Sequence, residues 1–304
     1  MGIISYAQNL EDVMLWRALG DVAQGFWIDI GASDPVQHSV TRAFFERGWH
    51  GVNVEPMPAP FARLQAGRPG DINLNLAIGA ANGRMVFYDC EDSSLATLEP
   101  AVAERNRADG RRVEARDIEV ITLAELCRLQ APADIHFLKI DVEGAEAQVL
   151  AGADFATWRP WIILLEATIP LSQTDSSQDW EPGLLAQGYR FAWFDGLNRF
   201  YIAAERWDAL AQHFRAPANV WDDYTLFDAP HAAECARLRA EISLLRSSFS
   251  TAPPSAPAPL AKRVARRLRA FVTAELRGEL AQLRLEVARL AGEVAALRAS
   301  QLRP

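Results

Sequence analysis

The decapeptide FWIDIGASDP, residues 26–35, has the pattern of a buried strand that ends in a loop. Four of its first five residues are apolar, and Gly31 follows the last of them directly. In open α/β sheets, ligands bind at the carboxyl ends of parallel strands, where such loops lead into the next helix. The stretch therefore predicts a ligand site at Asp29, Gly31 and Ala32.

Apolar runs alternate with helical patterns on the carboxyl side of this stretch. Strand-like runs lie at 51–55, 71–79, 84–90, 118–123, 135–141 and 161–166, and helical patterns near 38–48, 59–66, 98–107, 122–129 and 145–151. Such apolar runs separated by helices are typical of buried parallel strands in βαβ units. Two later runs, 189–195 and 199–205, flank a short turn with glycine and predict an antiparallel hairpin. We therefore expect an α/β fold with a mostly parallel, twisted sheet and a C-terminal hairpin.

The character of the sequence changes near residue 230. We expect a catalytic domain at 1–230, a short amphipathic helix at 231–249, a Pro-rich linker at 250–260 and a long helix at 261–304. Leu and Val recur in the long helix from Leu276 to Leu297 with alternating steps of four and three residues. Val at a and Leu at d favour a parallel two-stranded coiled coil. Because a linker precedes this helix, we expect a homodimer rather than a helix docked on its own body.

Charge divides the chain in the same place. From Glu234 onward there are 13 Lys and Arg against 6 Asp and Glu, whereas the whole chain has a net charge of −8. The remaining body, at −15, would repel a phosphate backbone, so no nucleic-acid partner is expected. The basic stretch 262–269 predicts either a solvated flank of the coil or contact with an anionic membrane surface.

Other compositional signals are few. The three cysteines are widely spaced, which argues against disulfides and a zinc site, and no histidine cluster suggests another metal. No signal peptide and no apolar run of membrane-spanning length is present. We therefore expect a cytoplasmic protein, peripheral at the inner face of the membrane, with no bound metal.

A second acidic residue follows the next strand-like run. Glu55 ends the run 51–55 and lies 24 residues beyond Gly31. A carboxylate at about this spacing accepts hydrogen bonds from ribose hydroxyls in nucleotide-type cofactors. One glycine flanked by acids suits a cationic adenosyl ligand such as S-adenosylmethionine better than a diphosphate. Helix capping is the alternative for both acids.

A third acidic group ends the run at 135–141. The segment FLKIDVEGAE, residues 137–146, delivers Asp141 and Glu143 to the carboxyl end of a buried strand. Both should line the crevice that holds Asp29 and Glu55. Helix capping, or an ion pair with Lys139, is the alternative for Glu143.

Together these segments resemble the FkbM family of S-adenosylmethionine-dependent methyltransferases. The resemblance covers about residues 4–225 and rests on SYAQNLEDVMLWRAL (5–19), WIDIGASDP (27–35), SVTRAFFERGWHGVNVEP (39–56), FLKIDVEGAEAQVL (137–150) and FDGLNRFYIA (194–203). It implies a Rossmann-like class I methyltransferase fold and methyl transfer to oxygen. It also implies that Asp29, Gly31, Ala32 and Asp141 contact the cofactor, that Glu55 binds ribose, and that Asn75 and Ala77 lie near adenine.

Transfer of a methyl group to a hydroxyl requires a base within hydrogen-bond reach of the acceptor. Asp141 is our first expectation, because its strand ends at the centre of the sheet; Glu166 is the second, and Glu143 is a further catalytic candidate. Candidates for contact with the substrate are Glu11, Asp12, His38 and Trp180.

The sequence thus predicts an O-methyltransferase that acts on a carbohydrate hydroxyl. The acceptor is expected to be a glycan or a lipopolysaccharide-type molecule, either free or lipid-linked. An NAD(P)-dependent oxidoreductase and a non-catalytic scaffold with a relic cofactor pocket are the alternatives.

Overall fold

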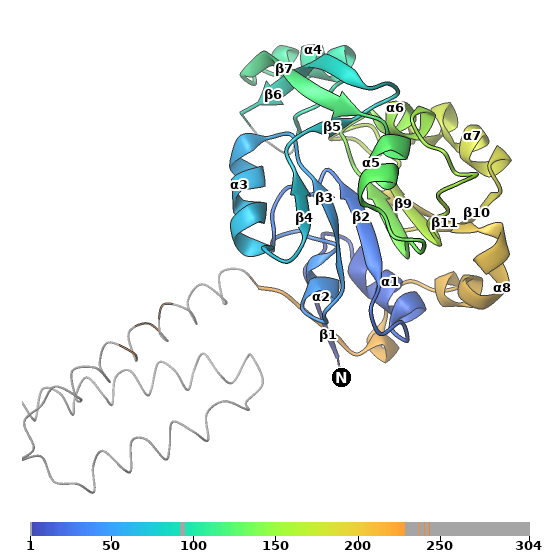
Figure 1. Ribbon diagram of the computed structural model, residues 1–304. Helices are drawn as coiled ribbons and strands as arrows, with labels where there is room; N and C mark the ends of the chain where they lie inside the picture. The colour runs from blue at the N-terminus through green and yellow to red at the C-terminus, as the bar shows by residue number, and fades with distance from the viewer. Residues whose placement is uncertain (1, 92–94, 229–236, 238–239, 241–242, 244–304) are drawn as a thin grey trace, which may run out of the picture. The chain divides into compact units, whose positions relative to one another are not determined.

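The computed structural model describes residues 2–91 and 95–228, together with the single positions 237, 240 and 243 (Figure 1). The chain divides into two compact units, Met1–Leu226 and Phe227–Pro304. The predicted linker at 250–260 and coiled coil at 261–304 lie outside the described residues, as does nearly all of the predicted helix at 231–249.

The first unit is a mixed α/β fold built on two main sheets. Its strands are β1 (Ile3–Ser5), β2 (Phe26–Ile30), β3 (His50–Val54), β4 (Ile72–Leu74), β5 (Ala77–Ile78), β6 (Gly83–Cys90), β7 (Val113–Ile121), β8 (Phe137–Ile140), β9 (Ile162–Glu166), β10 (Tyr189–Phe194), β11 (Asn198–Ala203) and β12 (Tyr224–Leu226). Its helices are α1 (Glu11–Leu19), α2 (Arg42–Phe45), α3 (Pro58–Gly67), α4 (Pro100–Ala108), α5 (Leu123–Gln130), α6 (Glu146–Ala151), α7 (Glu181–Ala186) and α8 (Trp207–Leu210).

The larger sheet has seven strands in the order β10-β11-β9-β8-β2-β3-β4. The strands from β9 to β4 pair in parallel, and β11 pairs antiparallel with both β9 and β10. The predicted hairpin is therefore confirmed. Strand β2, formed by the apolar run that precedes Gly31, lies near the middle of this sheet and is buried along its whole length.

Helices cover both faces of the large sheet (Figure 1). Ile28 and Ile30 of β2 join one apolar cluster with residues of α5, α6 and α7. Trp27 points to the opposite face and joins a second cluster with residues of α1 and α2. This alternation is the two-residue period of a strand, and burial on both faces explains why the sequence of β2 is almost continuously apolar.

A smaller sheet corrects part of the sequence prediction. The runs at 84–90 and 118–123 are not buried parallel strands: β6 and β7 pair antiparallel over eight residue pairs and form a separate three-stranded sheet in the order β5-β7-β6. The predicted strand at 71–79 is divided between β4 of the large sheet and β5 of the small one. The alternation of exposed charged residues with half-buried ones along β7 is typical of a strand with one solvated face.

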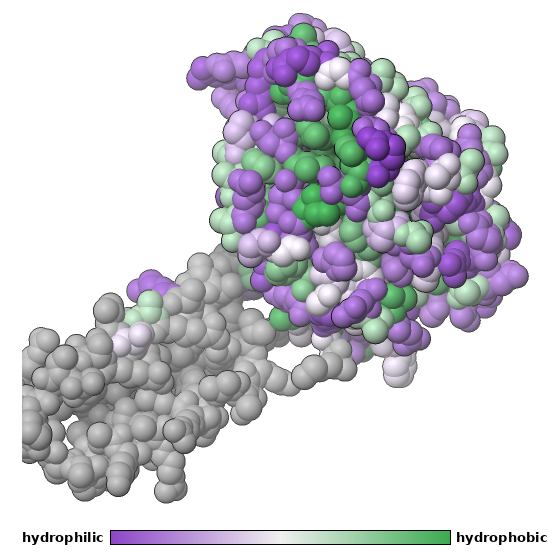
Figure 2. Space-filling model, viewed as in Figure 1, coloured by the Kyte–Doolittle hydropathy of each residue, from purple (hydrophilic) through white to green (hydrophobic). Residues whose placement is uncertain are grey.

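The surface of the described unit is mixed in polarity. On the face drawn in Figure 2, apolar surface gathers in front of the β3–β5 region and is bordered by polar residues. Within the described residues, no helix combines the length and apolar character needed to cross a membrane.

Candidate functional site

A cavity of about 970 Å³ opens at the carboxyl ends of the parallel strands. Residues that follow β2, β3, β8 and β9 line it, and so do Glu11 and the start of β11. Of the predicted site residues, those that line the cavity are Asp29, Gly31, Ala32, Glu55, Ala77, Asp141, Glu143, Glu166, Glu11 and His38. The sheet therefore brings together acids that are far apart in the sequence.

The loop after β2 is held tightly against its neighbours. Gly31 has φ +83°, and a Cβ atom at this position would lie 1.8 Å from the backbone oxygen of Asp141. The backbone N–H of Ser33 donates to Glu55 Oε2 at 2.9 Å, and that of Met57 donates to Oε1 at 2.7 Å. Glu55 thus joins the ends of β2 and β3, and burial raises the pKa of its carboxyl group.

Lys139 is the cation at the centre of this edge of the sheet. Its Nζ lies 3.1 Å from Asp141 Oδ2, 3.4 Å from Asp29 Oδ1 and 3.3 Å from the Gly31 carbonyl oxygen. Lys139 and Asp29 are both buried. Two carboxylates and a carbonyl oxygen thus keep the buried ammonium group paired.

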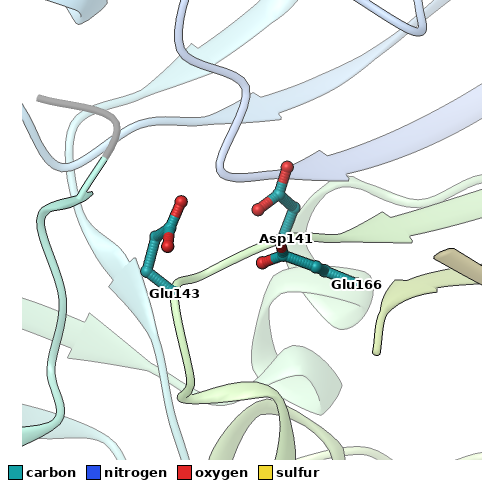
Figure 3. A group of neighbouring side chains, drawn as sticks. All are labelled: Asp141, Glu143 and Glu166. Atoms are coloured by element: carbon teal, nitrogen blue, oxygen red, sulfur yellow. The ribbon is translucent and has the colours of Figure 1, made fainter. Parts of the chain in front are cut away.

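Three carboxyl groups meet next to Lys139 (Figure 3). Asp141, Glu143 and Glu166 each offer an oxygen atom, and these atoms lie within 4.8 Å of one another. The sequence named all three as catalytic candidates but predicted no metal site, because Glu166 ends a strand 25 residues after Asp141 and no local metal-binding motif links them. Such a group can hold a cation or retain a proton.

Glu166 retains the proton in the unliganded protein. Its Oε2 is buried without a hydrogen-bond partner among the described residues. Burial, together with the nearby carboxylates of Asp141 and Glu143, raises the pKa of Glu166 to about 10. At neutral pH Glu166 is therefore a neutral group that can donate a hydrogen bond.

A pH-dependent stability follows from Glu166. Because its pKa is higher in the folded than in the unfolded chain, its proton stabilises the fold at low pH, and this contribution is lost as pH rises toward 10. Glu166→Gln should flatten the fall of the free energy of unfolding between pH 6 and 9, by up to about 1.4 kcal/mol per pH unit. Thermal unfolding of both proteins across this range checks it, with exposed Glu119→Gln as control. Parallel curves for the wild type and Glu166→Gln would contradict the assignment.

The far end of the cavity, beyond β9, is formed by Glu11. Asn198 Nδ2 donates to its Oε1 at 2.9 Å, and the Asn9 backbone N–H donates to its Oε2 at 2.7 Å. The Asn198 backbone N–H in turn donates to Asp195 Oδ1 at 2.7 Å. Glu11 is 4% exposed, and burial raises its pKa to about 7.

A further buried acid shapes the turn after β8. Glu146 Oε1 accepts hydrogen bonds from the backbone N–H groups of Val142 and Gly144, and burial raises the pKa of Glu146 to about 7. This arrangement fixes Glu143, whose φ of 55° is unusual for a residue with a side chain. An acid in the first turn of a helix is a recognisable capping signal, so Glu146 could have been found from the sequence.

Two of the predicted site residues, Asn75 and Asp12, have other roles. Asn75 Nδ2 donates to the backbone oxygens of Glu55 and Pro56, and its side chain does not line the cavity. Asp12 is fully buried and accepts hydrogen bonds from Ser5 Oγ and from the backbone N–H of Tyr6, Ala7 and Val13. Asn75, predicted to lie near adenine, and Asp12, predicted to contact substrate, thus both hold backbone segments in place.

Trp180 also differs from the prediction. Its side chain is 6% exposed and packs edge-on against Tyr201 within the core. It lies outside the cavity lining, so no ring face is open for stacking on a sugar. The sequence showed an aromatic residue in a polar segment but could not show that α7 turns it inward.

Two contributors were missed because their roles depend on tertiary contacts. Lys139 was considered only as a partner of Glu143, and Asn198 only as part of a hairpin turn. Neither the segment around Asp29 nor the segment around Asp141 indicates that Lys139 lies between these two acids, which belong to neighbouring strands. Asn198 reaches Glu11 across 187 residues of sequence.

A mostly parallel sheet with a cavity at the carboxyl ends of its strands defines an α/β protein with a candidate ligand site at that edge. The model of the methyltransferase FkbM domain matches residues 29–191, more than half of the chain, which therefore belongs to the FkbM methyltransferase family.

A crystal structure of methyltransferase FkbM from Methylobacillus flagellatus KT is similar over 66% of this chain, with 15% sequence identity and a TM-score of 0.42. This chain covers 48% of that protein, about half of its length. Among curated proteins, none matches the sequence significantly.

Proposed function

We propose that the chain is an S-adenosylmethionine-dependent methyltransferase that methylates a carbohydrate hydroxyl. The observation that carries this proposal is the row of acids in one cavity: Asp29 lies near the end of β2, and Glu55 and Asp141 directly follow β3 and β8. Family membership supports the reaction class. The strand order, with an antiparallel β11 beside β9, supports a class I methyltransferase fold.

The cavity suits a cationic adenosyl ligand. Gly31 gives close backbone approach at a place where a Cβ atom would clash, but the loop lacks the further glycines that cradle a diphosphate, and its acids would repel one. Asp29 Oδ1, which lies 3.4 Å from Lys139 Nζ and accepts no hydrogen bond from the described residues, adds negative charge that favours a cationic ligand. An apolar wall that includes Met57, Ala77 and Phe87 adjoins Glu55 and suits a flat ring.

Roles for the chain's residues follow from these positions. When bound, the donor supplies a methyl group activated by a positively charged sulfur. We propose that Glu55 binds the ribose hydroxyls and that Asp29 and Asp141 hold the positively charged part of the donor. Holding the two reactants in place in this cavity can lower the barrier by about 7–11 kcal/mol.

We propose a sugar hydroxyl as acceptor because the cavity is polar beyond β8, where Glu166, Thr168, Ser172, Gln173 and Asn198 line it. These side chains offer the donors and acceptors that a polyhydroxylated molecule needs. A glycan or lipid-linked glycan, as the sequence resemblance implies, fits this chemistry.

Isothermal titration separates the three candidate functions. S-adenosylhomocysteine should bind and NADH should not. Binding of NADH alone would favour the oxidoreductase, and binding of neither would favour a scaffold with a relic pocket.

The role of Glu55 gives a specific prediction. Glu55→Ala should weaken S-adenosylhomocysteine binding by about 1.5–3 kcal/mol, because charge-assisted hydrogen bonds to ribose are lost. It should also destabilise the unliganded protein, since the Ser33 and Met57 N–H groups lose their acceptor. Titration below the variant's unfolding temperature measures the first effect, and Asn75→Ala, which disturbs the same loop without touching the cavity, is the control. An unchanged dissociation constant for Glu55→Ala would remove Glu55 from the donor site.

The C-terminal segment supports further proposals from sequence alone. We propose that residues 261–304 form a parallel coiled coil that joins two chains, and that the basic stretch 262–269 contacts an anionic membrane carrying the acceptor. We accordingly propose that the enzyme is cytoplasmic and binds peripherally at the inner face of the membrane.

A further inference from the structure

We propose that Glu11 is the general base of the reaction, the group that accepts the proton of the acceptor hydroxyl. This inference rests on the proposed function and assigns a role that neither the sequence motifs nor the family membership gives to this residue. It is carried by the place of Glu11 in the cavity and by the contacts that hold it there.

Glu11 lies at the opposite end of the cavity from the donor side. Glu55 follows β3, whereas Asn198, the partner of Glu11, begins β11. These strands are separated by β2, β8 and β9 in the sheet, so they lie about 19 Å apart at the usual spacing of strands. A donor bound over β2 and β3 would therefore leave the space between β8 and Glu11 for the acceptor.

The Glu11 carboxylate is held in one orientation and still has free lone pairs. Asn198 Nδ2 and the Asn9 backbone N–H each donate one hydrogen bond to it, one to each oxygen. A carboxylate can accept about four, and Glu11 faces the cavity. A base fixed in this way needs little reorganisation when it receives a proton.

The other acids of the cavity are less suited to this task. Asp141 Oδ2 is already engaged in an ion pair with Lys139 Nζ at 3.1 Å, so this oxygen is less available to an acceptor hydroxyl. Glu166 already carries a proton at neutral pH, since its pKa is raised to about 10. Glu166 lies opposite Asn198 in the backbone register of β9 and β11, and both residues line the cavity, so the Glu166 proton can instead be donated to another oxygen of the same acceptor.

The charged groups that face Glu11 are consistent with a base that works near neutral pH. Asp12 and Asp195 raise its pKa, burial raises it further, and Lys139 is the cation within electrostatic range. The resulting value of about 7 lies close to the optimum for a general base.

The step balances as follows. The acceptor's O–H bond breaks and its proton moves to a Glu11 oxygen, while the acceptor oxygen forms a bond to the methyl carbon. The carbon–sulfur bond of the sulfonium donor breaks, and its electron pair remains on sulfur, which becomes neutral. Glu11 then loses its proton to solvent through the open cavity.

Glu11→Gln tests the assignment, with Asp141→Asn for comparison and exposed Glu119→Gln as the control. The assay uses S-adenosylmethionine with a labelled methyl group and a glycan extract of the cells that make the protein. Glu11→Gln should lower kcat about 10²–10⁴-fold and leave S-adenosylhomocysteine affinity within about two-fold. In the wild type and in Asp141→Asn, kcat/KM should fall below pH 7, whereas residual activity of Glu11→Gln should lose this dependence.

A second measurement does not depend on activity. Carbon-13 NMR of labelled glutamate carboxyl groups should show a signal that titrates near pH 7 and is absent from Glu11→Gln. Retained activity or an unchanged pH profile in Glu11→Gln, or loss of the acid limb in Asp141→Asn, would overturn the role of Glu11. A wild-type protein that binds S-adenosylhomocysteine keeps the proposed function in either case, and one that neither binds it nor transfers label overturns both proposals.

Discussion

Gly31→Ala should destabilise the unliganded protein by about 2–5 kcal/mol, a large part of the 5–15 kcal/mol that typically separates folded from unfolded states. Two costs add up. The left-handed backbone at φ +83° disfavours a side chain by about 1–2 kcal/mol. A Cβ atom 1.8 Å from the Asp141 carbonyl oxygen must also push β2 away from β8, at about 1–3 kcal/mol.

Gly48→Ala is a matched control for Gly31→Ala. Gly48 has nearly the same backbone angle, φ +82°, but nothing lies within 4 Å of its Cβ position. Chemical denaturation of both variants isolates the cost of the close approach. Gly31→Ala should also weaken S-adenosylhomocysteine binding, whereas Gly48→Ala should not. Equal destabilisation by the two substitutions would contradict the packing described for the loop after β2.

Lys139→Met should cost about 3–5 kcal/mol at pH 8, because it leaves two carboxylates without the cation between them. Asp29 is buried at 1% exposure and cannot recover its solvation in water. Denaturation curves of the wild type and of Lys139→Met at pH 8 measure this loss.

Arg128→Met provides the comparison for Lys139→Met. Arg128 pairs with Glu125 on the surface, with 63% of the Arg128 side chain exposed, and such pairs contribute less than about 1 kcal/mol. Lys139→Arg should also destabilise, because a planar guanidinium does not replace a compact ammonium at a site with three close oxygens. If Lys139→Met costs no more than Arg128→Met, the central ion-pair network is not formed.

The sequence predicted the large sheet well because its signals are local. The apolar runs that became β2, β3, β8 and β9 are nearly continuous, as burial on both faces requires. Asp29, Glu55 and Asp141 could be placed at one edge because parallel strands point their carboxyl ends the same way.

The parts that the sequence did not predict depend on contacts between distant segments. Whether β6 pairs in parallel or antiparallel is decided by β7, and a run of apolar residues alone does not specify its partner. Asp12 and Glu11 are adjacent in the sequence, yet one is enclosed by backbone donors and the other faces the cavity. The burial of Trp180 likewise depends on Tyr201 of β11.

Transfer of a labelled methyl group from S-adenosylmethionine tests the central claim most directly. The wild-type protein should move the label into the carbohydrate fraction of a glycan extract from the producing cells, and acid hydrolysis should release a methylated sugar. Addition of S-adenosylhomocysteine should suppress the transfer. If the protein binds S-adenosylhomocysteine but leaves all label in the donor, or places it on protein or nucleic acid instead, the account of a carbohydrate O-methyltransferase is contradicted.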